Sequence, residues 1–185
     1  MKGVRGIIVK NEIIEWIKTI VLSVAIALLI TTFVKPTIVR QHSMSPTLQE
    51  YDFLIINRLL YKRSGPENGD IVVFQSDLKT SMGRDKLLIK RIIAIPGDTV
   101  LVEDGIVYLN GRALDEPYLE NVYTEGKAVE GKEIEVPEGK VFTMGDNRGN
   151  SRDSRDESIG LVDIDEIVGK AFLRLYPFNK LGFIN

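Results

Sequence analysis

One short polar stretch holds the residue types of a nucleophilic site. Residues 41–48 read Gln-His-Ser-Met-Ser-Pro-Thr-Leu and include the single histidine of the chain. A serine becomes a nucleophile when a neighbouring base takes its proton, and His42 is the first candidate base for Ser43. Adjacent side chains of an extended chain point to opposite faces, so we expect His42 to be a surface residue instead. A plain polar turn is the alternative interpretation of the whole stretch.

A lysine is the other base that can serve a serine. An ordinary lysine has a pKa near 10.4, so it must be desolvated before it can accept a proton at neutral pH. Lys90 stands within the apolar run 87–95, which fits that requirement. Strand alternation by itself would instead turn Lys90 outward on a half-buried strand. The pattern leaves both arrangements open.

The composition restricts the chemistry further. The 185 residues are 44% hydrophobic, which is enough for one ordinary domain plus an appendage. The formal net charge of -2 comes with no basic stripe, so nucleic acid is not an expected partner. Without cysteine and with one histidine, thiolate catalysis is excluded and no metal site is expected. An active site would be built from Ser, Lys, Asp, Glu, Arg or Tyr.

The elements that position these residues begin with a membrane anchor, expected over residues 13–35. Residues 13–34 would form about 33 Å of largely apolar helix, which spans a bilayer. A cleavable signal peptide is the rival, but no small-x-small pattern follows Val34. Four basic residues precede or open the apolar segment: Lys2, Arg5, Lys10 and Lys18. Because positive charges favour the cytoplasmic side, we expect residues 1–12 in the cytoplasm and residues 36–185 on the extracytoplasmic side of the cell membrane.

Beyond Pro36, which should end the helix, the pattern becomes that of a mainly β domain. Strands are expected at 53–56, 71–74, 87–95, 99–102 and 106–109, with a hairpin turn at Asp104-Gly105. A small inserted subdomain or loop region is expected at about 101–139. Its acidic part, 115–138, is typical of a solvated segment rather than of core.

Four blocks of sequence, in order behind the anchor, resemble those of the type I signal peptidases, a family of membrane-anchored bacterial serine proteases. They are 43–48 (SMSPTL), 69–74 (GDIVVF), 90–98 (KRIIAIPGD) and 145–155 (GDNRGNSRDSR). One block alone says little, whereas four in order are specific. The likeness covers nearly the whole chain and is to single-span, Gram-positive-like members. It implies a β catalytic domain of the kind shared with self-cleaving (LexA-like) repressor peptidases.

The resemblance also implies residue roles. Ser43 would be the nucleophile, Lys90 the general base, and Ser151 the hydroxyl that orients the lysine amine. The further supporting residues would be Asp153 and Arg155 as a charge pair with Arg91 nearby, and Gly145 and Asp146 as turn residues that hold Ser151 in place. The family often carries Ser, Thr or Gly two residues before the nucleophile, where a hydroxyl helps to hold the oxyanion. Gln41 stands there, so the Ser43 backbone N–H is expected to act, with the Gln41 amide as a second donor.

The implied activity is removal of N-terminal signal peptides from exported preproteins after small-x-small sites, typically with alanines, without a metal or other cofactor. The matching pocket walls are Val39, Met44, Leu48, Leu54, Val73, Leu88 and Ile89, which would equally suit an ordinary β core. Expected partners are signal peptides of secreted preproteins, membrane lipid and the nearby export translocon. A membrane-tethered, noncatalytic peptide-binding module is the alternative. A self-cleaving repressor-type peptidase is a weaker one, because that family is soluble and carries a DNA-binding domain.

Overall fold

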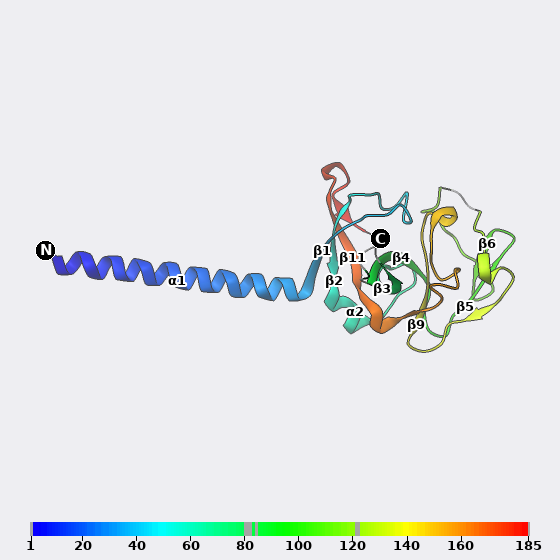
Figure 1. Ribbon diagram of the computed structural model, residues 1–185, viewed down its shortest axis with the longest axis horizontal. Coiled ribbons are helices and arrows are strands. Elements are labelled where there is room, and N and C mark those ends of the chain that lie inside the picture. Colours follow the sequence, from blue (N-terminus) through cyan, green and yellow to red (C-terminus); the bar gives the residue numbers. More distant parts are fainter. Residues whose placement is uncertain (1, 80–82, 84, 121–122, 185) are drawn as a thin grey trace.

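The N-terminal part of the structure is a single helix that projects from a β domain (Figure 1). The computed structural model describes residues 2–79, 83, 85–120 and 123–184. Helix α1 (Lys2–Phe33) contains the segment Glu12–Phe33, which is long and apolar enough to cross a membrane and has no buried part. The helix ends at Phe33, before the expected end of the anchor at residue 35. Pro36 therefore lies in the next strand, at the sheet edge where a missing N–H is tolerated.

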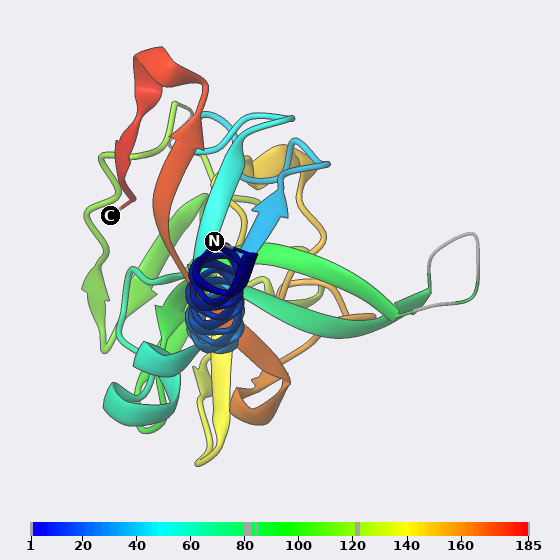
Figure 2. The ribbon, with the colours of Figure 1, turned by 90° about the vertical axis from the view of Figure 1, so that its left-hand side faces the viewer.

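An antiparallel sheet of eight strands forms the larger layer within the described residues. These strands are β1 (Val34–Ile38), β2 (Phe53–Asn57), β3 (Ile71–Lys79), β4 (Asp85–Ala94), β9 (Lys140–Met144), β10 (Val162–Asp163), β11 (Ile167–Tyr176) and β12 (Gly182–Phe183). Their order is β1-β2-β11-β3-β4-β9-β10, and β12 pairs with the outer part of β11. Figure 2 shows the long β3–β4 ribbon extending to one side of the sheet.

A second antiparallel sheet of four strands lies at the end of the domain away from α1 (Figure 1). It consists of β5 (Thr99–Glu103), β6 (Ile106–Leu109), β7 (Arg112–Ala113) and β8 (Ile134–Glu135) in the order β7-β6-β5-β8. The expected hairpin is present, since Asp104 and Gly105 have φ of 52° and 81° between β5 and β6. Two residues with positive φ match the right-handed twist of the flanking strands.

Short helices connect the strands. They are α2 (Arg58–Ser64) and the 3-10 turns η1 (Lys127–Val129), η2 (Arg148–Asn150), η3 (Ile164–Glu166) and η4 (Phe178–Lys180). The acidic segment 115–138 contains η1 and β8, and its Thr124 and Val136 are buried. Most other described residues of the segment are exposed or half-buried, as expected of a solvated segment. Val136 packs in an apolar cluster between the small sheet and β9, which ties the segment to the core.

The interior half of β4 is what places the candidate site in the core. From Lys90 to Ala94 every residue of β4 is buried, whereas Leu88 is the one buried residue among 85–89. β9 pairs with Arg91–Ala94, and two apolar clusters cover the opposite faces of this part of the sheet. A side chain pointing to either face is therefore withdrawn from water.

Candidate active site

Ser43 lies in the turn that follows β1. Its side chain is largely shielded, with 8% of the residue exposed, and its carbonyl oxygen accepts a hydrogen bond of 3.0 Å from the Asn147 N–H. The neighbouring Met44 anchors the turn by packing, fully buried, in the apolar cluster of β2 and β3. The polar stretch is thus fixed against the sheet at both the backbone and the side-chain level.

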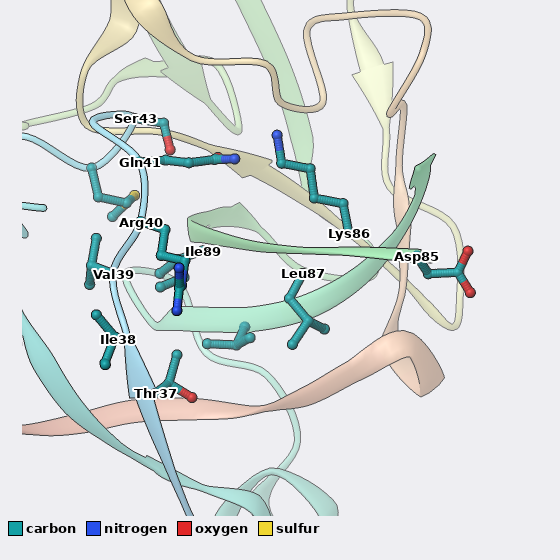
Figure 3. Close-up of a pocket in the computed structure, with 12 residues that line it drawn as sticks. Thr37, Ile38, Val39, Arg40, Gln41, Ser43, Asp85, Lys86, Leu87 and Ile89 are labelled. Atoms are coloured by element: carbon teal, nitrogen blue, oxygen red, sulfur yellow. The ribbon is translucent and has the colours of Figure 1, made fainter. Parts of the chain in front are cut away.

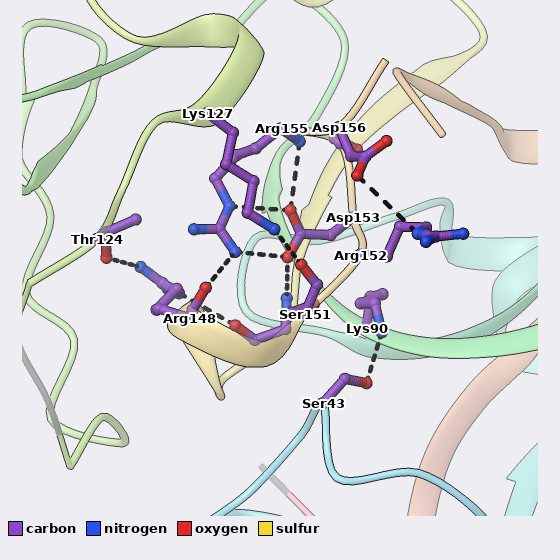
Figure 4. Close-up of polar contacts among 12 residues, drawn as sticks. Ser43, Lys90, Thr124, Lys127, Arg148, Ser151, Arg152, Asp153, Arg155 and Asp156 are labelled. Atoms are coloured by element: carbon purple, nitrogen blue, oxygen red, sulfur yellow. Dashed lines mark hydrogen bonds and ion pairs between the residues drawn. The ribbon is translucent and has the colours of Figure 1, made fainter. Parts of the chain in front are cut away.

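The side chain of Lys90, on β4, reaches the side chain of Ser43. The Lys90 Nζ lies 2.6 Å from Ser43 Oγ and donates a 3.1 Å hydrogen bond to the Ile89 carbonyl (Figure 4). Lys90 is 1% exposed, so the outward arrangement suggested by strand alternation does not occur. The reason is that both faces of β4 are covered at this position. The nucleophile and the base inferred from the family pattern are therefore in hydrogen-bond contact.

Burial changes the acidity of the lysine. Desolvation is the main cause that lowers the pKa of Lys90, to about 8, and the positive charge of Lys86 lowers the pKa further. The negative charge of Asp153 acts in the opposite direction. A pKa of about 8 leaves an appreciable neutral fraction at neutral pH, which a general base requires.

His42 takes no part in this contact. Its side chain is 62% exposed, and its Nε2 lies 3.5 Å from Glu50 Oε2. The expectation that the lone histidine is a surface residue is confirmed. Its backbone carbonyl does contribute, because it accepts a 3.1 Å hydrogen bond from the Asn147 side-chain amide, which helps to hold the Ser43 turn.

Ser151 and Gly145 lie against the back of the nucleophile. Ser151 is buried at the end of η2, and its Oγ makes no hydrogen bond within the described residues. The inferred role of Ser151 is to orient the Lys90 amine, but in this structure the two groups are not hydrogen-bonded. A Cβ at Gly145 would lie 2.3 Å from Ser151 Oγ and 2.3 Å from the Ser43 carbonyl oxygen. Gly145 is thus a spacing residue, because only a residue without a side chain fits here.

Gly145→Ala should therefore reduce cleavage while keeping the fold. The added methyl group displaces Ser43 or Ser151. A displacement of about 1 Å in a reacting group costs about 100-fold in rate. The measurement is kcat/KM on a peptide with an alanine-x-alanine site. Gly149→Ala is the matched control, since nothing lies within 4 Å of its Cβ position. Equal rates for the two variants would contradict the spacing role.

Asp153 and Arg155 form a buried charge pair behind Ser151. Asp153 accepts hydrogen bonds of 2.9 and 2.8 Å from Arg155 Nε and Nη2, and both side chains are fully buried. Burial would raise the pKa of the Asp153 carboxyl, but the hydrogen bonds and charge of Arg155 and the Gly145 N–H hold that pKa below its ordinary value. The pair thereby fixes the backbone of the Gly145 turn.

Arg91 belongs to a separate pair. Its guanidinium donates two hydrogen bonds to Asp146, of 3.0 and 2.9 Å. The ring of Tyr118 lies beneath it, with 3.9 Å from Arg91 Cζ to the ring centroid. Asp146 is therefore more than a turn residue, since it connects the turn that follows β9 to Arg91 of β4.

Arg148 and Glu116 are structural residues of the site that sequence reasoning missed. Arg148 is 3% exposed and binds Glu116 through two nitrogens, one of them at 2.9 Å, and Thr124 Oγ1 at 2.8 Å. Its Nε donates to the Gly145 carbonyl at 3.2 Å. Glu116 lies in the acidic segment 115–138, where the sequence does not distinguish a carboxylate that binds an arginine from one that faces solvent. No local signal in the sequence distinguishes it.

An apolar groove leads away from Ser43 (Figure 3). The segment 37–41 and β4 lie on its two sides, with Ser43 at one end. Four of the seven inferred wall residues line it: Val39, Met44, Val73 and Ile89. Leu88 lines an adjoining cavity on the other side of Ser43, while Leu48 and Leu54 are not among the lining residues and pack behind the wall in the core.

Two donors beside the nucleophile remain available. Gln41 lines both cavities, and Figure 3 shows its side chain extending across the groove near Ser43. Within the described part of the chain, neither the Gln41 amide nor the Ser43 N–H donates a hydrogen bond. Both are therefore free to bind an oxygen of a ligand.

The chain is similar to known proteins over most of its length. The family model "Signal peptidase, peptidase S26" matches residues 13–176. A signal peptidase I of Bacillus licheniformis is 38% identical over 179 residues, covering 93% of each chain. Signal peptidase I S of Bacillus subtilis strain 168 is 38% identical, covering 95% of this chain and 96% of its own. The solved structure of a signal peptidase I from Enterococcus faecalis V583 is 32% identical, covering 57% of this chain and 95% of its own, with a TM-score of 0.44. The match over most of both sequences establishes that the chain belongs to the signal peptidase family, peptidase S26, as a signal peptidase I.

Proposed function

We propose that this enzyme is a membrane-anchored Ser-Lys endopeptidase that removes N-terminal signal peptides from exported preproteins, cutting after small-x-small sites. The observation that carries the proposal is the 2.6 Å contact between the Lys90 amine and Ser43 Oγ, beside an apolar groove. A buried lysine in contact with a serine hydroxyl is a base placed at its nucleophile. Peptide hydrolysis is what such a pair performs.

The reaction has two halves. Neutral Lys90 takes the proton of Ser43 as Oγ attacks the scissile carbonyl, and the lysine then gives that proton to the leaving amine. An acyl group remains on Ser43. Lys90 next takes a proton from a water molecule, whose oxygen attacks the acyl carbon. The bond between that carbon and Ser43 Oγ breaks, Oγ takes the proton from Lys90, and the cleaved signal peptide leaves with a free carboxyl group. Each half begins with the uncharged amine, which burial favours by lowering the pKa of Lys90.

The oxyanion of the tetrahedral intermediate would be held by the Ser43 N–H and the Gln41 amide. Both groups lie at the end of the groove and have no partner among the described residues. Donors of this kind are fixed in place before the charge develops, so little reorganisation is needed during the reaction. Gln41 would thus fill the position for which the family often uses a hydroxyl.

The substrate would lie extended along the groove, with its small residues against Val39, Met44, Val73 and Ile89. Such a strand could pair with the outer edge of β4, as in β-augmentation.

The anchor would bring enzyme and substrate to one surface. Residues 13–35 would cross the cell membrane with residues 1–12 in the cytoplasm and the peptidase domain, 36–185, outside, close to the export translocon. Ser43 follows Phe33 by ten positions, which keeps the site near the lipid headgroups where a signal peptide emerges. Tethering both partners to one surface raises their effective concentration.

The pH dependence of cleavage tests the proposal. Because the neutral lysine is the active form, kcat/KM should rise about tenfold per pH unit below its pKa and level off above about 8. The measurement uses the full chain in detergent micelles and a preprotein with an alanine-x-alanine site. A preprotein with phenylalanine at both small positions is the control and should stay intact. A flat profile between about pH 6 and 9 would rule out Lys90 as the base.

A further inference from the structure

Two cavities meet at Ser43, and they lie on opposite faces of the outer half of β4. The apolar groove includes Leu87 and Ile89 in its lining, and the adjoining cavity includes Leu88 and Lys90. Successive residues of a strand point to opposite faces, which accounts for this division. β9 pairs with Arg91–Ala94 only, so residues 85–89 have an edge without a strand partner among the described residues.

A peptide strand added to this edge would divide its side chains between the same two faces. Side chains directly opposite each other in paired strands share a face. The two small residues of the cleavage site, which alternate along the peptide, would enter the apolar groove beside Ile89. The residue between them must then point to the other face, toward the cavity lined by Leu88.

Lys86 is the charged group that this intervening side chain would approach. It shares the face of Leu88 and Lys90, and diagonal neighbours across paired strands are within reach of long side chains. Figure 3 shows its amine extending toward the end of the groove where Gln41 and Ser43 lie, while Asp85 points away. Asp85 is bound by Lys79 and by Gln75 at 2.8 Å. Among the described residues, the Lys86 amine has no hydrogen bond and no ion pair.

We propose that Lys86 is a specificity-determining residue that selects an acidic side chain at the position between the two small residues of the cleavage site. The inference rests on the proposed function, since it requires an extended substrate in the groove. A cation without a counter-ion in a cleft attracts a carboxylate and repels an ammonium group. Arg152, which also lines this cavity, has Asp156 at 4.0 Å, whereas Lys86 and Arg40 have no ion pair among the described residues. Of these two, Lys86 is the one that stands on β4 and shares the face of Leu88.

The test compares three peptides that differ only in the middle residue: Ala-Asp-Ala, Ala-Asn-Ala and Ala-Lys-Ala. For the full chain in detergent, kcat/KM should be roughly five- to tenfold higher with aspartate than with lysine, as expected for one solvent-accessible charge contact. Lys86→Gln should bring the ratio close to one, Lys86→Glu should invert it, and Lys86→Arg should keep it. The ratio is the readout because a change at Lys86 also acts on the Lys90 amine and alters all three rates together.

Two outcomes would overturn the assignment: the ratio is near one in the unmodified enzyme, or it survives in Lys86→Gln. In the second case, loss of the ratio in Arg40→Gln would assign the selectivity to Arg40. Arg40 is the matched comparison because it also lines both cavities. Cleavage of the neutral Ala-Asn-Ala peptide reports separately on the proposed function. If that peptide is cut and the ratio is one, only the role of Lys86 is wrong.

Discussion

Lys90→Met should abolish cleavage and at the same time make the protein more stable. Methionine is close to lysine in length and fills the same space without an amine, so Ser43 loses its base while the packing remains. Loss of one member of a cooperating nucleophile and base pair costs about 10⁴-fold or more in kcat. Ser43→Ala should give a loss of the same order. The measurement is the rate of shortening of a preprotein by each variant in detergent.

The stability gain follows from the acidity of Lys90. Folding lowers the pKa of this lysine from 10.5 to about 8, so below about pH 8 folding opposes its charging, at a cost of about 3 kcal/mol. The unfolded chain binds the extra proton between the two values, so the stability of the native enzyme should rise as the pH increases from about 8 to about 10.5. Lys90→Met should remove this rise and be more stable by up to about 3 kcal/mol at pH 7.

Urea unfolding in micelles, followed by pulse proteolysis at several pH values, checks this result. Lys140→Met is the control, because Lys140 is an exposed lysine paired with Asp163 and should keep the activity. A Lys90→Met protein that still cuts the preprotein would exclude the dyad. If the unmodified protein and Lys90→Met both bound signal peptides and neither cut the preprotein, the noncatalytic peptide-binding alternative would be favoured. A variant that is inactive and less stable would mean that the lysine is buried in its charged form.

The parts of the fold that the sequence predicts are those determined by local pattern. The β5–β6 hairpin is one, because Asp104 and Gly105 define the turn and apolar residues flank it on both sides. β11 was missed although it lies at the centre of the large sheet, between β2 and β3. Gly169 and Lys170 interrupt its apolar pattern, and only two of its ten residues are buried. Its place depends on pairing with strands about a hundred residues earlier, which no local window contains.

The candidate site divides in the same way. Ser43 and Lys90 are identified by family blocks, but alternation along β4 would have turned Lys90 outward. Its burial depends on residues distant in the chain, because Val72 of β3 lies opposite it in the sheet and Ser43 lies against its amine. The Arg148–Glu116 pair has the same origin, since a carboxylate in an acidic segment shows no sign of its distant partner. Sequence patterns therefore give the two residues proposed to react, whereas the groups that support them become visible only in three dimensions.

Arg155→Met should destabilise the enzyme by about 3 to 5 kcal/mol at pH 7, because it leaves the Asp153 carboxylate buried without its main partner. The pKa of the Asp153 carboxyl would then rise, because burial is no longer offset by Arg155. The native pair contributes stability above about pH 4, where an unfolded aspartate is ionised, and loses it as the pH falls through the depressed value. Urea unfolding of the full chain in micelles measures the difference.

Two further variants separate the charge effect from loss of packing. Asp153→Asn combined with Arg155→Met removes both charges, so it should be less destabilising than Arg155→Met alone. Lys140→Met breaks the exposed pair with Asp163, whose nitrogen and oxygen are 2.7 Å apart, and should cost less than about 1 kcal/mol. If the double variant were as unstable as the sum of its parts, Arg155 would act by filling space. Because Asp153 also accepts the Gly145 N–H at 3.0 Å, Arg155→Met should slow cleavage even where the protein remains folded. The pair thus connects stability to catalysis: the same carboxylate that needs Arg155 holds the turn against which Ser43 rests.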